Sequence, residues 1–220
     1  MTTYTVKTDQ GEQEILIRKL PVDKIGIYTS GGIDSTLLLE LYARENIPFT
    51  PYYLDRHEPK EYVAALRIIE RINQRHGLDL ELVNIEIELD PEGPGDFIEG
   101  MRFLGDKVQC MITGDNLNPP DYVIADSNTE APGRLPVEKQ YNYDNWELPL
   151  LHVDKSYIIK LALDLDCEWI FELARTCGIY YNTFEPYMIE AGQLRCDKCF
   201  YCKERAWGFQ MCNSTDPGIE

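Results

Sequence analysis

Positively charged residues are scarce in this 220-residue sequence. Lys and Arg together number 21, against 38 Asp and Glu, which gives a formal net charge of −17. A protein that covers nucleic-acid phosphates usually presents a basic surface, so this charge balance argues against nucleic acid as a partner. A local positive pocket for a phosphorylated small molecule is compatible with it. We therefore expect small-molecule partners and no nucleic acid.

Long apolar runs are also missing. No stretch approaches the roughly 20 residues that a membrane-spanning helix needs, and residues 1–7 lack the apolar centre of a secretory signal. Hydrophobic residues still make up 44% of the chain, enough to form a core. We expect a cytoplasmic protein that makes no membrane contact.

Histidine is rare too, with three residues, and the seven cysteines are an odd number without a secretion signal. A disulfide framework is therefore not expected. Cys196, Cys199 and Cys202 are separated by two residues each, a spacing that lets a tight turn direct three thiols at one tetrahedral Zn²⁺. Cys177 is the favoured fourth ligand and Cys212 its competitor. A redox dithiol or an iron–sulfur cluster is the alternative use of this pattern.

The remaining pattern predicts an α/β fold. Alternating residues at 4–7 and 13–18, around a Gly-containing turn, predict a β-hairpin. Further strands are expected at 24–29, 48–54, 80–88, 108–113 and 148–151, and helices at 35–45, 58–75, 96–106, 155–165 and 167–175. Strands that alternate with helices at this spacing predict a parallel five-stranded doubly wound sheet.

We expect three parts in the chain: an N-terminal hairpin extension over 1–22, a nucleotide-binding α/β domain over 23–165, and a C-terminal helical zinc-binding region over 166–220. The run 117–147 contains several prolines and little periodicity. A long loop of this kind is usually functional, so we favour a substrate-facing excursion or lid over an ornamental surface loop.

The stretch SGGIDS at positions 30–35, called the 30–35 loop below, stands between an expected strand and an expected helix. Its glycines let the backbone turn sharply, and the start of the helix adds free N–H donors and the positive end of the helix dipole. A phosphate cradle is the favoured interpretation, and a purely structural turn is the alternative. The loop has no Lys at the helix start, so it is not the GxxxxGK[ST] loop.

The string SGGIDS resembles the signature of the PP-loop ATP pyrophosphatases, which bind ATP at this loop and usually split it to AMP and pyrophosphate. TCG at 176–178 and CDKCFYCKERAWGF at 196–209 resemble the cysteine region of the 7-cyano-7-deazaguanine synthase family within that superfamily. Shorter motifs of the family have partial matches at residues 54–57, at residues 114–116, and at Lys155 after a Pro-Leu segment. Two features depart from the family: Cys177 stands 19 residues before Cys196, and a Tyr-Pro-Asp-Cys-Arg stretch has no counterpart.

This resemblance implies the adenine nucleotide alpha hydrolase-like (HUP) fold with a C-terminal zinc-binding appendage. It implies ATP, Mg²⁺ and Zn²⁺ as cofactors, and ATP, ammonia and a deazaguanine carboxylate as substrates of a nitrile-forming ligase, with a possible homodimer. By resemblance the cofactor-binding residues are Ser30, Gly31, Gly32, Asp34, Ser35 and Gly114; the catalytic residues are Lys155, Arg56 and His57; and the metal ligands are Cys177, Cys196, Cys199 and Cys202.

Several alternatives stay open at this point. Asp34 is either a partner of Mg²⁺ or a helix-capping acid, Lys155 either faces phosphate or lies on a solvated helix face, and Arg56 with His57 is either catalytic or an ordinary surface pair. Another PP-loop branch, a sulfur transferase or an adenylylsulfate-type reductase, would need a nucleophilic cysteine near the loop. Cys110 is expected to pack in the core instead. A zinc-stapled ATP-binding module without turnover is the non-enzymatic alternative.

Overall fold

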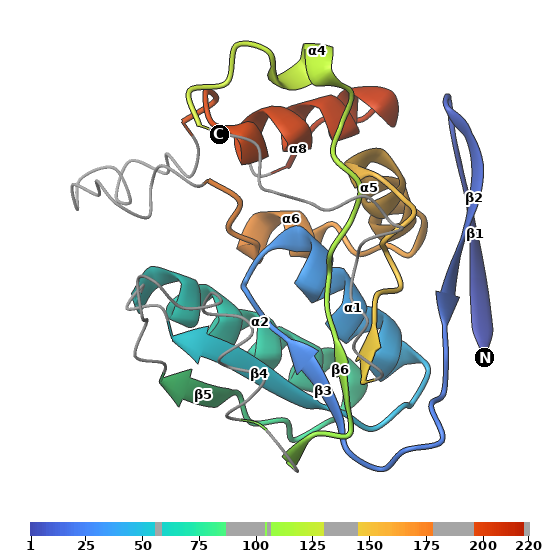
Figure 1. The fold of residues 1–220 in the computed structure, drawn as a ribbon, viewed down its shortest axis with the longest axis vertical. Coiled ribbons are helices and arrows are strands. Elements are labelled where there is room, and N and C mark those ends of the chain that lie inside the picture. The colour runs from blue at the N-terminus through green and yellow to red at the C-terminus, as the bar shows by residue number, and fades with distance from the viewer. Residues whose placement is uncertain (56–58, 87–103, 105–106, 130–144, 178–195, 218–220) are drawn as a thin grey trace.

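The computed structural model describes residues 1–55, 59–86, 104, 107–129, 145–177 and 196–217 (Figure 1). Its centre is a sheet of five strands in the order β5-β4-β3-β6-β7, and every neighbouring pair is parallel. These strands are β3 Ile25–Tyr28, β4 Thr50–Asp55, β5 Val83–Glu86, β6 Cys110–Ile112 and β7 Trp146–Glu147. The expected five-stranded parallel α/β sheet is confirmed.

The strand order reverses direction at β3. After β3 the chain adds β4 and β5 on one side, and then returns to add β6 and β7 on the other. The carboxyl ends of β3 and β6 therefore lie side by side at a topological switch point, which is where open α/β sheets bind their ligands.

Apolar side chains alternate between the two faces of the sheet because successive strand residues point in opposite directions. Ile25, Ile27 and Ile112 belong to the larger core cluster, whereas Tyr52 and Met111 belong to a second cluster. Each face therefore carries its own buried core, as a doubly wound sheet requires.

The expected hairpin is confirmed. Strands β1 Thr2–Thr8 and β2 Gly11–Ile17 pair antiparallel, with Thr8 opposite Gly11, across a two-residue turn. Its apolar residues Val6, Ile15 and Ile17 are part of the larger core cluster. At the tip of the turn, the Gln10 amide donates to Ser156 Oγ at 2.9 Å, so the hairpin is fastened to the start of a helix.

The larger core cluster contains residues from all three expected parts of the chain. Its members include Val6 of the hairpin, residues of the α/β domain and residues of the C-terminal region, among them Ile27, Leu38, Ile158, Ile170, Phe171 and Phe209. The three expected parts of the chain thus share one apolar core, while the boundaries drawn at 22 and 165 stay a prediction.

The fifth strand lies slightly earlier than the sequence predicts. Trp146 and Glu147 pair with Met111 and Ile112 of β6, whereas residues 148–151 form a turn in which Leu151 N donates to Leu148 O at 3.2 Å. Pro149 has no N–H to offer a sheet ladder, which favours the turn. The expected strand at 148–151 is therefore wrong, because strand pairing and not local apolarity selected the position.

The helices are α1 Ile33–Arg44, α2 Pro59–His76, α4 Asp121–Ile124, α5 Lys155–Asp164, α6 Trp169–Leu173 and α8 Phe200–Met211. Helices α1, α2, α5 and α6 occur where periodicity predicts them, with shifted ends, whereas α4 and α8 were not predicted. Helix α4 and strand β7 both fall inside the run 117–147, so that run is not structureless, although residues 130–144 lie outside the described part. The helix expected over 96–106 also lies largely outside it. Within the described residues, no helix has both the length and the hydrophobicity to cross a membrane.

A buried charge network joins α1 to α2. The carboxylate of Glu40 is fully buried and lies 2.9 Å from His76 Nε2, 3.1 Å from Arg44 Nη2 and 3.6 Å from Arg75 Nε. Burial by itself raises the pKa of Glu40, but the His76 hydrogen bond and the two guanidinium groups outweigh it and lower the pKa below its ordinary value. Glu40 is therefore held as a paired anion in the core.

Candidate functional site

The 30–35 loop connects β3 to α1 through a tight glycine turn. Gly31 has a φ of +76°, in the left-handed region that favours glycine. Gly32 is the N-cap of α1, and no side chain caps that helix start by a hydrogen bond. The hydroxyls of Ser30 and Ser35 lie 3.2 Å apart beside it. The loop thus combines a helix N-terminus with two hydroxyls, an arrangement that suits an anion.

The loop after β6 presses directly against this turn. A Cβ atom added to Gly114 would lie 2.8 Å from Asp34 Cβ and 3.0 Å from Ser35 N. Those distances are too short for any residue with a side chain, so glycine at 114 is what lets the two loops meet. Figure 1 shows β3, the start of α1 and the end of β6 converging on one side of the sheet.

Lys155, the first residue of α5, reaches into this side of the sheet. Its side chain is only 3% exposed, and its ammonium lies 2.5 Å from both carboxylate oxygens of Asp34. A second carboxylate, that of Glu204 on α8, lies 3.6 Å from the same ammonium and is 1% exposed. The solvated-helix alternative for Lys155 is therefore wrong. Asp34 is paired with it and does not cap α1.

Two carboxylates of this cluster, those of Asp34 and Glu204, lie close to the ammonium of Lys155. Carboxylate oxygens are also the ligands that Mg²⁺ prefers. The donor set around Asp34 therefore fits a magnesium ion that accompanies a phosphate group.

Two predicted catalytic residues, Arg56 and His57, lie outside the described residues. They follow β4, whose carboxyl end is at the same edge of the sheet as those of β3 and β6. Their roles stay a prediction.

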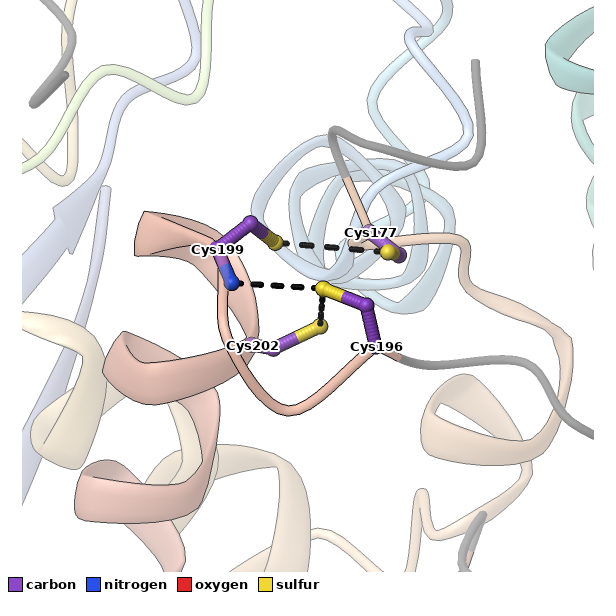
Figure 2. Close-up of side chains that lie close together, drawn as sticks. All are labelled: Cys177, Cys196, Cys199 and Cys202. Carbon is purple, nitrogen blue, oxygen red and sulfur yellow. Dashed lines mark hydrogen bonds between the residues drawn. The ribbon is translucent and has the colours of Figure 1, made fainter. Parts of the chain in front are cut away.

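The four expected metal ligands come together in space. The sulfur atoms of Cys177, Cys196, Cys199 and Cys202 all lie within 4.8 Å of one another, and Figure 2 shows the four side chains converging. Cys196 Sγ lies 3.9 Å from Cys202 Sγ, and Cys199 Sγ lies 4.0 Å from Cys177 Sγ. These separations are far longer than a disulfide bond of about 2.05 Å.

The same separations fit zinc. A Zn–S bond of about 2.3 Å places the sulfurs of a tetrahedral site about 3.8 Å apart, close to the two distances above. The turn also stabilises thiolate, because the backbone N–H of Cys199 donates to Cys196 Sγ at 3.2 Å and that of Lys198 donates at 3.4 Å. The intervening Asp197 adopts a left-handed φ of +55°, which closes the turn. Zinc bound here would fix the turn to the segment that carries Cys177.

Cys212 is not part of this group. Its Sγ donates to Ser156 O at 3.2 Å, on the side of α8 that packs against α5. Of the two candidates for the fourth ligand, the structure brings Cys177 to the cluster.

The cysteine centre is connected to the 30–35 loop through the chain around Cys177. Arg175 N donates to Gly31 O at 2.8 Å, two residues before that cysteine. The guanidinium of Arg205, fully buried on α8, makes two bonds to the carboxylate of Asp216, at 2.7 and 2.8 Å, and donates to Phe171 O at 2.7 Å. Helix α8 is thereby fixed against α6 and the segment that follows it.

Sequence reasoning missed Glu204 and Arg205 as parts of the site. A signal was present, since three consecutive charged residues, Lys203, Glu204 and Arg205, stand between the cysteine triplet and an apolar stretch. Which one faces Lys155 depends on the orientation of α8, and this is a tertiary property.

The three cysteines outside the centre are not activated. Burial, reinforced by the nearby charge of Glu147, raises the pKa of Cys110 to about 11. Burial likewise raises the pKa of Cys167 and that of Cys212 to about 11. A thiol with such a pKa is protonated at neutral pH and is a poor nucleophile.

No family model matches the sequence, and no curated protein matches it either. Among solved structures, the fold is similar to that of NMN synthetase from Francisella tularensis, with 15% sequence identity, a TM-score of 0.46, and coverage of 89% of this chain and 79% of that chain. A similarity of this size carries no functional conclusion, so function is inferred from the site itself.

Proposed function

We propose that this protein is an ATP-dependent ligase that adenylates a carboxylate and joins it to ammonia. The observation that carries the proposal is the place of the 30–35 loop at the switch point of the sheet, with the buried Lys155 paired to Asp34. A helix N-terminus beside two hydroxyls suits a polyphosphate, and a carboxylate next to it suits the Mg²⁺ that the polyphosphate brings.

In this proposal each group of the loop acts on the leaving pyrophosphate. The backbone N–H groups at the start of α1 and the hydroxyls of Ser30 and Ser35 hold its oxygens. Asp34 would hold the accompanying Mg²⁺, which would supply positive charge to the phosphates. Lys155 offsets the charge that develops as the bond to the α-phosphate breaks. The contacts with Asp34 and Glu204 hold the Lys155 ammonium beside the 30–35 loop for this role.

The proposed reaction uses two ATP-dependent activations, one of the acid and one of the amide. The carboxylate oxygen attacks the α-phosphate of ATP to give an acyl adenylate and pyrophosphate. Ammonia then displaces AMP to give an amide, with loss of a proton. A second ATP adenylates the amide oxygen and releases a second pyrophosphate, and elimination of AMP and a proton leaves a nitrile. On the resemblance in the 30–35 loop and the cysteine region, we propose 7-carboxy-7-deazaguanine as the acid and 7-cyano-7-deazaguanine as the product.

The cysteine centre has a structural role in this proposal. Zinc held by Cys177 and the triplet would join α8 to the chain that hydrogen-bonds Gly31. Bound Zn²⁺ is worth on the order of 10 kcal/mol to small metal-dependent elements. The metal would therefore stabilise the position of the chain that contacts the 30–35 loop, and it would take no part in the bond-forming steps.

A thiol-based PP-loop reaction is the weaker candidate. A sulfur transferase or an adenylylsulfate-type reductase needs a reactive thiolate near the nucleotide. Cys110, Cys167 and Cys212 are buried or half-buried, and their pKa values are raised to about 11. The other four thiols gather in the metal centre. A zinc-stapled ATP-binding module without turnover remains the non-enzymatic alternative.

The test measures products. Purified protein is given ATP, Mg²⁺, ammonium and 7-carboxy-7-deazaguanine. Release of pyrophosphate and AMP is measured together with the mass of the deazaguanine product. The proposal expects two ATP consumed for each nitrile formed. ATP binding without release of pyrophosphate, with this acid or others of its class, would favour the module.

A matched pair of variants ties turnover to the site. Asp34→Ala should lower kcat by about 100-fold or more, as removal of a group that stabilises transition-state charge does. Asp164→Ala, which removes an exposed carboxylate paired with Lys160 on α5, should leave turnover unchanged. Equal effects of the two substitutions would contradict the role given to Asp34.

A further inference from the structure

Asn116 carries a buried amide that has no hydrogen-bond partner within the described part of the chain. It stands four residues beyond the end of β6, and only 1% of it is exposed. Neither its Nδ2 nor its Oδ1 has a partner among the described residues. Buried polar groups are nearly always hydrogen-bonded because leaving them unpaired is unfavourable. An amide that is unpaired at both atoms therefore needs an explanation.

The backbone on both sides of Asn116 is held in place. Two residues before it, Gly114 is packed against Asp34 and Ser35 of the 30–35 loop. One residue after it, Leu117 N donates to Val153 O at 2.9 Å, and Val153 stands two residues before Lys155. Asn116 is thus positioned between the start of α1 and the start of α5, at the switch point of the sheet. The amide is unpaired in a well-fixed place.

We propose that Asn116 recognises a planar nitrogen heterocycle bound at this edge of the sheet, through a pair of hydrogen bonds. A carboxamide presents an N–H donor and a carbonyl acceptor side by side. Its complement is a group with an adjacent acceptor and donor, as in the lactam edge of a guanine-like base or the amino edge of adenine. Asn makes paired bonds of this kind to adenine in nucleic-acid recognition.

The charged groups of the proposed ligands do not complement both atoms of the amide. Phosphate and ionised carboxylate oxygens only accept hydrogen bonds, so they leave the Asn116 carbonyl unpaired. Ammonia has no acceptor beside its donors once it is ammonium. The inference rests on the proposed function for the presence of a base here. It assigns Asn116 a part in selecting that base, separate from the phosphate contacts of the 30–35 loop.

The first arm of the test measures stability without ligand. Asn116→Leu replaces the unpaired amide with an apolar group of similar size, so the melting temperature should stay the same or rise. Asn73 offers a matched control, because its amide donates to Leu80 O at 2.9 Å and accepts from Leu80 N at 2.9 Å. Asn73→Leu should lower the melting temperature by about 2–4 °C, as loss of a satisfied pair does in a chain of this size.

The second arm measures affinity by calorimetry, with Mg·ATP and with 7-carboxy-7-deazaguanine separately. Asn116→Leu should weaken one of the two by about 10- to 100-fold, whereas Asn73→Leu should weaken neither. Loss for Mg·ATP alone identifies adenine as the base that is recognised. Loss for the acid alone identifies the lactam of the acceptor.

Two results would overturn the inference. One is a drop in melting temperature for Asn116→Leu as large as that for Asn73→Leu, which means that the amide has a structural partner. The other is an Asn116→Leu variant that binds both probes as tightly as the wild type does, provided that the wild type binds them. Failure of the wild type to bind Mg·ATP would instead overturn the proposed function. The stability arm needs no nucleotide and still decides whether the Asn116 amide is structural.

Discussion

The ammonium of Lys155 and the carboxylate of Asp34 form a two-oxygen ion pair at 2.5 Å across 121 positions of sequence. Glu204 adds a second carboxylate 3.6 Å from the same ammonium. The pair joins the first turn of α1 to the first turn of α5, and Glu204 brings in α8, the helix that begins at the cysteine centre. One buried cation therefore holds together the three elements that frame the candidate ATP site.

Removing that cation should destabilise the fold. Lys155→Met removes the ammonium that both the Asp34 and the Glu204 carboxylates contact, so the free energy of unfolding should fall by about 3 kcal/mol. Adding Glu204→Gln to this variant should recover part of the loss, because one of the two carboxylates is then neutral. Urea denaturation of the wild type, both single variants and the double variant gives the coupling energy. Strictly additive effects would show that the contact between Lys155 and Glu204 contributes nothing.

Metal content should depend on Cys177 and not on Cys212. Elemental analysis of the purified protein should give one zinc per chain, and Cys177→Ser should lower both the zinc occupancy and the melting temperature, since three thiolates hold the metal less tightly than four. Cys212→Ser is the matched control, because that thiol donates to a backbone carbonyl beside α5. Iron in place of zinc, or loss of metal only in the Cys212 variant, would contradict this assignment.

The stabilisation that Glu40 provides at neutral pH should be lost at acid pH. The pKa of Glu40 is lowered below its ordinary value of 4.5, so its ionised form stabilises the fold. That contribution is complete above the ordinary pKa and is lost as the pH falls through the lower pKa of the folded state. Glu40→Gln should therefore be less stable than the wild type at pH 7, by about 1–3 kcal/mol.

The pH profile of this difference is the decisive measurement. The free energy of unfolding of the wild type minus that of Glu40→Gln should shrink as the pH falls below 4.5. Acid release of the metal affects both proteins equally and cancels in the difference. A difference that stays constant from pH 7 to pH 3 would mean that Glu40 is not a paired anion in the folded protein.

Local patterns were enough to predict much of the fold. The hairpin alternation, the short apolar strands and the helix periodicities act over a few residues, so they can be seen without knowing which segments meet. The 30–35 loop is of the same kind, because a strand, two glycines and a helix start are consecutive in sequence. The cysteine triplet is local as well, and its spacing predicted the turn that Asp197 closes.

Such local patterns do not predict which segments pair as strands across the sheet. β7 consists of two residues, Trp146 and Glu147, and its position follows from their register with β6. The stretch 148–151 has the stronger apolar signal but forms a turn. Strand position here depends on which backbone groups find partners, and local composition does not contain that information.

What the sequence determined by itself is a set of local features: a glycine turn at a helix start, a set of thiols with zinc spacing, and an acidic composition with few Lys and Arg residues. Only the tertiary structure decided which side chains act together. It buried Lys155 between Asp34 and Glu204, brought Cys177 and not Cys212 to the triplet, and left the Asn116 amide unpaired beside the loop. The physical reason is that charge pairing, metal coordination and desolvation depend on distance in space, and helix orientation sets that distance after the chain has folded.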